Sequence, residues 1–292
     1  TYTQVINDWS AVDPSRNGPH RSYLTGTRTR LRHGTELIET ARTYSWSDYG
    51  ARTRTTDLGF TSGGTDLDAS DTVSTIRFFT PNAAKYIVRQ PYEQRVVQGL
   101  NNTSNRALWL SSEEYLYEGN GTAQAAANST NLTEKRIWNG AVIGTLTRAV
   151  VHKYAYDARG NLTKHTTPRG HSTTYAYDSS KHLFRVSETN ALGHTTATAW
   201  DMGCQAPDTV TGINGLVTDY TYDSHCRETY ASLPGGDYVD TSYSGLGDPG
   251  TQFIGKTSRS PSTAPGQDTR WTREYFDGFG ESYRTVSTGA TS

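Results

Sequence analysis

The chain has 292 residues, of which 33% are hydrophobic, 11% aromatic and 20% charged, with a formal net charge of −1. This charge balance, with no long basic run, argues against nucleic acid as a partner, and no stretch approaches the roughly 20 apolar residues of a membrane span. The apolar content is low for a thick globular core, but the aromatic content argues against disorder, so composition favours a broad, largely solvated sheet.

The first 149 residues are predicted to be a β-rich region with degenerate repeats. Residues 31–38 have the pattern of a hairpin. Residues 40–50 contain two aromatic residues two positions apart, followed by Asp48 and Gly50, and this order resembles the repeats found later in the chain. Further strands are predicted at residues 53–58, 72–79, 85–89, 93–97, 107–110, 114–117 and 136–138. Residues 119–130 have no strand pattern and are predicted to be a mobile loop.

Three carboxylates in this region, Asp66, Asp68 and Asp71, are spaced like the start of a calcium loop. The twelfth position of that loop is Arg77 rather than Glu, which excludes an EF-hand. A looser calcium site stays open, since calcium needs several oxygen ligands that other segments could supply. The eight histidines are scattered and show no zinc-ligand spacing.

Residues 150–292 contain a repeat array. An aromatic residue followed by aspartate ends at Asp157, Asp178, Asp201 and Asp223, at intervals of 21, 23 and 22 residues. A glycine trails three of these aspartates by 13 to 15 residues, so two marks share one period. Each unit has the pattern strand, turn, strand, turn. The predicted fold is therefore all-β, an elongated strip of antiparallel hairpins stacked side by side.

The repeated aspartates are predicted to close turns rather than to catalyse a reaction. Aspartate can accept hydrogen bonds from the backbone two residues on, and glycine accepts a positive φ. Identical positions in every unit favour this structural role, because a catalytic pair would occur once. The predicted repeat and turn residues are Tyr156, Asp157, Gly160, Tyr177, Asp178, Trp200, Asp201, Tyr222, Asp223, Asp277 and Gly280.

Two cysteines, Cys204 and Cys226, occupy the place of Gly160 in successive units. One unit spans two strands, so equivalent positions should lie roughly 10 Å apart, whereas a disulfide needs Cα atoms within about 7 Å. Turns can lean together, so a disulfide and two free thiols both stay open.

Glycosylation is a separate question, raised by six Asn-x-Ser/Thr sequons. Several arise by chance in a chain so rich in threonine. The candidates that fall in the region around the predicted loop are Asn102, Asn120, Asn128 and Asn131.

The run Tyr156-Asp-x-x-Gly-Asn-Leu162 resembles the YD repeat of the Rhs family, which also occurs in the B and C components of insecticidal toxin complexes. Tyr275-Phe-Asp-Gly-Phe-Gly280 is similar to a related form of the repeat. The resemblance covers residues 150–288 and is weaker upstream. It implies a sheet that spirals into a hollow shell around a toxic polypeptide, hence a secreted, non-enzymatic structural segment without cofactors. The implied partners are other segments of the same longer polypeptide, copies of the chain, and the enclosed toxin.

An extracellular adhesion or filament subunit is the alternative, in which exposed Tyr and Trp on the same sheet would bind carbohydrate. An enzyme is less favoured, because the chain lacks a nucleophile elbow and a phosphate-binding loop. Gly247-Asp-Pro-Gly250 alone is too short to identify the self-cleaving aspartate motif known in the Rhs family.

Overall fold

The computed structural model describes residues 2–10, 22–62, 65–66, 71–100, 105–119, 128–139, 149–259 and 269–288. Within these ranges the chain forms 21 β-strands and three 3-10 turns of three residues each. The chain divides into two compact units, Thr1–Gly170 and His171–Ser292. The predicted boundary between residues 149 and 150 concerns the start of the regular repeats and stays a prediction.

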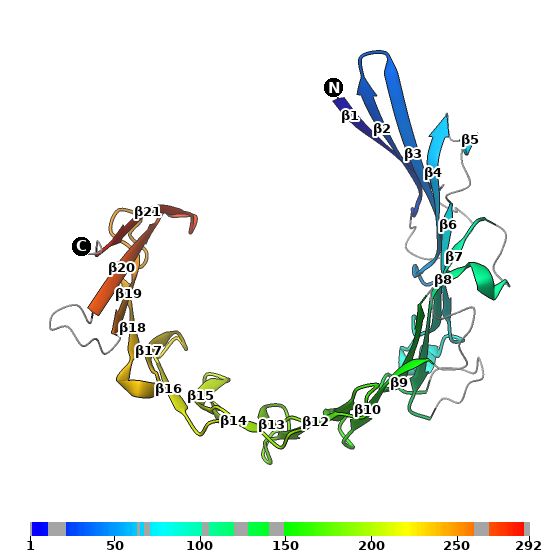
Figure 1. The fold of residues 1–292 in the computed structure, drawn as a ribbon. Helices are drawn as coiled ribbons and strands as arrows, with labels where there is room; N and C mark the ends of the chain where they lie inside the picture. The colour runs from blue at the N-terminus through cyan, green and yellow to red at the C-terminus, as the bar shows by residue number, and fades with distance from the viewer. Residues whose placement is uncertain are drawn as a thin grey trace. The chain divides into compact units, whose positions relative to one another are not determined.

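Unit 1 is an antiparallel meander in which each strand pairs mainly with its neighbours in sequence (Figure 1). Its strands are β1 (Tyr2–Trp9), β2 (Leu24–His33), β3 (Glu36–Trp46), β4 (Arg52–Ser62), β5 (Thr65–Asp66), β6 (Thr72–Phe78), β7 (Pro91–Gln98), β8 (Trp109–Tyr117), β9 (Leu132–Asn139), β10 (Val150–Tyr156) and β11 (Leu162–Thr166). The short β5 pairs with β4, which pairs onward with β6. The 3-10 turns η1 (Ala83–Lys85) and η2 (Arg106–Leu108) lie in its connections.

Unit 2 continues the same pattern with shorter strands, each antiparallel to the next. The strands are β12 (Ser172–Tyr177), β13 (Arg185–Thr189), β14 (Thr195–Asp201), β15 (Ala206–Thr211), β16 (Val217–Tyr222), β17 (Glu228–Ser232), β18 (Tyr238–Ser244), β19 (Phe253–Arg259), β20 (Thr269–Phe276) and β21 (Ser282–Ser287). In the described part of residues 150–288 the single helical element is η3 (Pro234–Gly236). The predicted all-β, antiparallel hairpin fold is confirmed.

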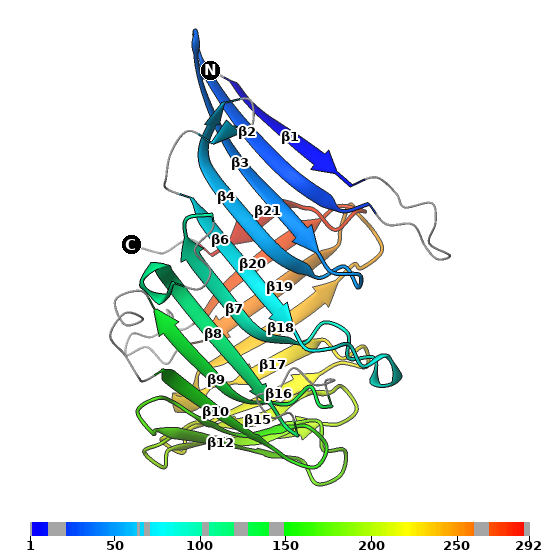
Figure 2. The ribbon, with the colours of Figure 1, turned by 90° about the vertical axis from the view of Figure 1, so that its right-hand side faces the viewer.

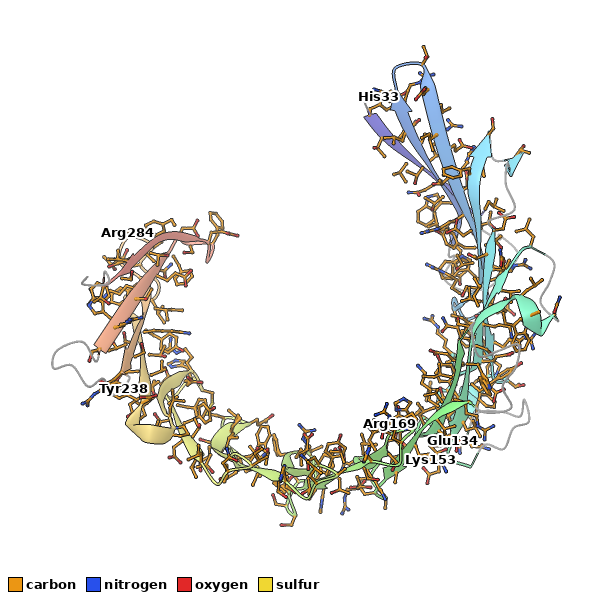
Figure 3. The ribbon with its side chains drawn as sticks, in the orientation of Figure 1. His33, Glu134, Lys153, Arg169, Tyr238 and Arg284 are labelled. Carbon is orange, nitrogen blue, oxygen red and sulfur yellow. A yellow bond between two sulfur atoms is a disulfide. The ribbon has the colours of Figure 1, made fainter. Side chains whose placement is uncertain are left out.

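Within each unit, the described strands form a single layer whose side chains stand on both faces (Figures 2 and 3). Burial comes mainly from neighbouring side chains on the same face, so few apolar residues are fully enclosed. The most enclosed apolar side chains of unit 1 are Val73, Val97 and Phe79, which are 0%, 2% and 4% exposed. Val73 and Val97 are direct partners across β6 and β7.

Three predicted segments differ from the structure. In the strand predicted at residues 107–110, residues 107 and 108 belong to η2, and β8 begins at Trp109. Residues 85–89 are predicted to form a strand, but Lys85 is the last residue of η1, its N–H donates to the side chain of Asn82 at 3.2 Å, and Tyr86 is left-handed with φ 56°. Only Ile87 makes a β-bridge there, with Asn82. Residues 255–259 are part of a stretch rich in Ser, Pro and Gly, 255–269, that the sequence predicts to be a connection, but they belong to β19, whose residues pair with both β18 and β20.

Candidate functional site

The repeated aspartates close the turns that link the strands. At the first turn of the regular array, Asp157 Oδ1 accepts hydrogen bonds from the backbone of Arg159 (2.8 Å) and Asn161 (2.9 Å), and its Oδ2 accepts one from Asn161 Nδ2 (3.0 Å). Gly160 has φ 86° and its N–H donates to the Asp157 carbonyl at 3.1 Å. The carboxylate and the positive φ together fix the reversal of the chain.

The other aspartates of the array act in the same way. Asp178 is 6% exposed and accepts backbone hydrogen bonds from four residues, Ser180, Lys181, Leu183 and Phe184. Asp201 accepts from two backbone N–H groups, as do Asp223 and Asp277. No described aspartate of this set lies in a group of three potential metal ligands.

These hydrogen bonds favour the charged carboxylates. Backbone donation by Lys181 holds the pKa of Asp178 far below its usual range, and backbone donation by Asn161 lowers that of Asp157. At Asp223 the Arg227 guanidinium, with Nε 2.7 Å and Nη2 2.6 Å from Oδ2, lowers the pKa to about 2. Asp157, Asp178 and Asp223 are thus held in the charged form, which accepts hydrogen bonds and is the opposite of what a general acid requires.

We expect Asp223→Asn to change how stability depends on pH. A carboxyl group whose pKa is about 2 in the folded chain and about 3.9 in the unfolded chain stabilises the fold above pH 4 and loses that contribution as the pH falls toward 2. The stability difference between wild type and Asp223→Asn should therefore shrink over that window in urea titrations. The control is Asp219→Asn, because Asp219 is an exposed residue within β16 and closes no turn. A difference that stays constant from pH 5 to pH 2 would contradict the assigned role.

The aromatic residues before Asp157, Asp201 and Asp223 have a second task, which sequence reasoning missed. Each sits at a register shift, opposite the first or second residue of the returning strand, as in the pairs Tyr156–Leu162 and Trp200–Pro207. Its hydroxyl or indole N–H donates a hydrogen bond to a backbone carbonyl in the preceding repeat. The residue that carries this carbonyl is the cross-strand partner of the aromatic residue in that preceding repeat. Tyr222 OH, for example, donates to Pro207 O at 2.7 Å, and Pro207 is the partner of Trp200.

This aromatic-to-carbonyl hydrogen bond recurs in both units. The donor and acceptor pairs are Trp46 to Leu24 (2.7 Å), Tyr156 to Leu132 (3.0 Å), Trp200 to Arg185 (3.0 Å), Tyr222 to Pro207 (2.7 Å) and Tyr243 to Glu228 (3.1 Å). Trp can replace Tyr at this position because its indole N–H is also a donor at the end of a large ring. The bond ties each repeat to the one before it and so fixes the register between hairpins.

We expect Tyr222→Phe to destabilise the chain by about 1 kcal/mol, the usual net value of one hydrogen bond, because the Pro207 carbonyl loses its donor while the ring keeps its packing. Chemical denaturation of both proteins measures the difference. Tyr220→Phe, at the other aromatic position of β16, is the matched control. Equal effects of the two substitutions would show that the hydroxyl of Tyr222 has no special role.

The same turn pattern continues upstream, where the sequence is less regular. In each case the backbone N–H after a strand-ending aromatic residue donates to the carbonyl just before the returning strand, as Asp157 N does to Asn161 O at 2.9 Å. The upstream pairs are Ser10 to Tyr23 (2.7 Å), Ser47 to Ala51 (2.8 Å), Phe79 to Gln90 (2.9 Å) and Glu118 to Asn131 (2.9 Å). The aromatic residues that precede them are Trp9, Trp46, Phe78 and Tyr117, and all four sit at a register shift.

Side chains reproduce the pattern in part. Asn131 Nδ2 donates to Glu118 Oε2 at 2.9 Å, as Asn161 does to Asp157. Ser47 Oγ accepts from Ala51 N at 3.1 Å, so Ser47, rather than the predicted Asp48, takes the aspartate position of the repeat at 40–50. Three of these upstream turns are longer than those of the array, because extra residues separate the two ends of the turn.

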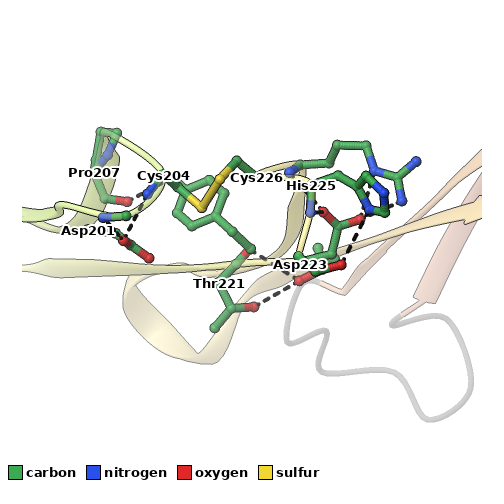
Figure 4. Close-up of a disulfide and its surroundings, with 12 residues drawn as sticks. Asp201, Cys204, Pro207, Thr221, Asp223, His225 and Cys226 are labelled. Carbon is green, nitrogen blue, oxygen red and sulfur yellow. Dashed lines mark hydrogen bonds and ion pairs between the residues drawn. A yellow bond between two sulfur atoms is a disulfide. The ribbon is translucent and has the colours of Figure 1, made fainter.

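The two cysteines form a disulfide between successive turns, with Cα atoms 5.1 Å apart (Figure 4). The roughly 10 Å expected for positions two strands apart applies within a sheet, whereas these residues lie in turns beyond the strand ends. Cys226 takes the position of Gly160 and has φ 59°. In the turn of Cys204 the left-handed residue is instead its neighbour Gln205, with φ 54°.

The remaining candidate residues have no common site. Asn102, Asn120 and Asp68 lie outside the described residues. Asn128 O accepts a hydrogen bond from Lys85 Nζ at 3.1 Å. The Asn131 amide donates to Glu118, so this sequon is engaged in a turn, and glycosylation stays a prediction. No metal cluster is found among the described residues, so the looser calcium site gains no support.

Comparison with known proteins agrees with this geometry. The RHS Repeat family model matches residues 156–196, which include two of the aspartate-closed turns. Residues 156–196 therefore contain RHS repeats. No curated protein matches the chain.

Solved structures share the fold of this chain over nearly its whole length. The crystal structure of TcdB2-TccC3 is similar with a TM-score of 0.65 and 12% identity, over 98% of this chain and 20% of that one. The TcdB2-TccC3-Cdc42 crystal structure is similar with a TM-score of 0.64 and 12% sequence identity, and the match covers 98% of this chain and 22% of that one. The structure of the Photorhabdus luminescens Tc holotoxin pore is similar with a TM-score of 0.60 and 11% sequence identity, and the match covers 91% of this chain and 21% of that one. This chain thus spans about a fifth of the length of those chains. In its described part, no helix is long and apolar enough to cross a membrane.

Proposed function

We propose that this chain is a wall segment of a larger, secreted RHS-repeat protein whose sheet encloses or delivers a toxic polypeptide. The observation that carries the proposal is the recurrence of one construction, an aspartate-closed turn plus an aromatic-to-carbonyl hydrogen bond, in a fold shared with toxin-complex proteins over 98% of the chain. Such a repeat makes a continuous sheet of any length, because each hairpin needs only its neighbours. The proposed role is structural and non-enzymatic.

The partners of this wall segment are other parts of the same longer protein and the enclosed polypeptide. Among the described strands, β1 pairs only with β2 and β21 only with β20. Their outer edges carry unpaired backbone groups, which are a template for further strands. In the proposed protein, neighbouring strands of the wall cover these edges.

Sedimentation and negative-stain imaging of the 292-residue chain test this proposal. A wall segment should give monomer or irregular aggregate, because its edges fit other parts of a wall rather than further copies of itself. Regular polymers built from copies of the chain would contradict the proposal and identify a filament subunit.

A further inference from the structure

Three arginines and one glutamate surround a small cavity on one face of unit 1. The cavity has a volume of about 170 Å³ and is lined by Arg54, Thr75, Arg77, Glu93, Arg95 and Val97. The cross-strand register explains why they meet. Arg54 of β4 faces Thr75 of β6, which faces Arg95 of β7, and Arg77 of β6 faces Glu93 of β7. Directly paired residues of an antiparallel sheet point to the same face, so all the charged groups lie on one side.

The charges of the side chains that line this cavity do not balance. Glu93 is 7% exposed and contacts two guanidinium groups, those of Arg77 at 3.2 Å and of Arg95. Arg54 donates instead to uncharged oxygens, Thr56 Oγ1 and Leu100 O, both at 3.3 Å. Among the side chains that line the cavity, three positive charges therefore stand against one carboxylate. Since the whole chain has a net charge of −1, this excess is local.

Position and size define what the cavity can take. Arg54 and Arg95 lie on strands two apart, so their α-carbons are separated by roughly 10 Å, a span that two long side chains can close around a small ion. The guanidinium fork matches the oxygens of sulfate, phosphate and carboxylate groups. A volume of about 170 Å³ is below the roughly 300 Å³ at which drug-sized ligand pockets begin.

We propose that the cavity between β4, β6 and β7 is a binding site for a small divalent oxyanion, phosphate or sulfate, either free or attached to a larger molecule. Arg54 and Arg95 grip the anion, and Glu93 holds Arg77 and Arg95 in place. Arg95 also lies over the Trp109 ring, with its guanidinium carbon 3.5 Å from the ring centroid. Binding therefore changes the environment of this indole.

The test is titration of the 292-residue chain with sodium sulfate, sodium phosphate and phenyl phosphate, followed by calorimetry and tryptophan fluorescence. Sodium chloride at equal ionic strength is the reference, because exposed charges respond to salt in general. We expect saturable binding of sulfate and phosphate and none of chloride. Phenyl phosphate distinguishes the sources, since it binds if the cavity accepts an attached phosphoryl group and fails if only the free ion fits.

Arg54→Met should weaken sulfate binding by on the order of tenfold or more, the value of one hydrogen bond to a charged group. Arg54→Lys should restore part of it, since the charge returns without the fork. Arg159→Met, in an exposed turn of the same unit, should bind like wild type. Circular dichroism checks the fold, and Arg54→Gln replaces Arg54→Met if that variant is unfolded. Equal responses to sulfate and chloride, or wild-type affinity in both Arg54→Met and Arg54→Gln, would overturn the proposal.

Discussion

Replacing Phe79 by alanine should destabilise unit 1 by about 3–5 kcal/mol, the range for removing a buried aromatic ring. Phe79 is 4% exposed in a sheet that encloses few apolar side chains. Its ring packs edge-on against Tyr92, with centroids 5.3 Å apart, and against Tyr117, with centroids 6.0 Å apart. The three rings join β7, β8 and the turn after β6. Removing the Phe79 ring leaves a cavity, and a single-layer sheet has few neighbouring side chains that could move in to fill it.

Phe60→Ala is the matched control, because it removes the same ring from the same unit at a position that is 55% exposed. Exposed substitutions usually change stability by less than about 0.5 kcal/mol. Urea denaturation followed by tyrosine and tryptophan fluorescence measures both. Similar losses for the two variants would mean that the three-ring cluster is not a core of unit 1.

Removing the disulfide should cost about 3 kcal/mol in unit 2, because the bond closes a loop with a sequence separation of 22 residues and so limits the unfolded chain. Under oxidising conditions, alkylation of the denatured chain followed by mass spectrometry should find no modified cysteine. After reduction it should find two. Urea denaturation of Cys204→Ser/Cys226→Ser then gives the loss of stability.

A second variant distinguishes the loss of the disulfide from the backbone strain that a substitution at Cys226 adds to its turn. Cys226 has φ 59°, a conformation that glycine adopts without strain and serine does not. Cys204→Ser/Cys226→Gly should therefore be less destabilised than the double-serine variant. Two reactive thiols in the untreated chain, or unchanged stability on reduction, would show that the cysteines are not bridged.

The regular array could be predicted from sequence because two features, the aromatic-aspartate pair and the glycine that follows it, repeat at nearly constant spacing. The aspartates and glycines report directly on turns, and the structure places Asp157, Asp178 and Asp223 in the expected positions. The role of the aromatic residue could not be read from one unit. The exchange of Tyr222 for Trp200 in neighbouring repeats was the available signal, since both side chains end in a hydrogen-bond donor.

Upstream, most repeats were hidden because extra residues divide their turns. Tyr117-Glu118 and Asn131-Leu132 belong to one turn, yet 12 residues lie between Glu118 and Asn131 in the sequence. A similar insertion hides the turn from Phe79 to Gln90, where the intervening residues, among them Pro81, Ala83 and Ala84, have no repeat pattern. Pairing between such distant residues is set by the sheet register, which a local pattern does not reveal.

The most direct test of the proposed wall segment is cryo-electron microscopy of the complete gene product that contains these 292 residues. We expect a hollow particle in whose wall β12 to β21 run in consecutive antiparallel order, with Trp200, Tyr222 and Tyr243 each donating to a carbonyl of the preceding repeat. Additional density inside the particle would correspond to the enclosed polypeptide. A solid globule, or a rod in which these strands form a separate domain with no enclosed space, would contradict the account.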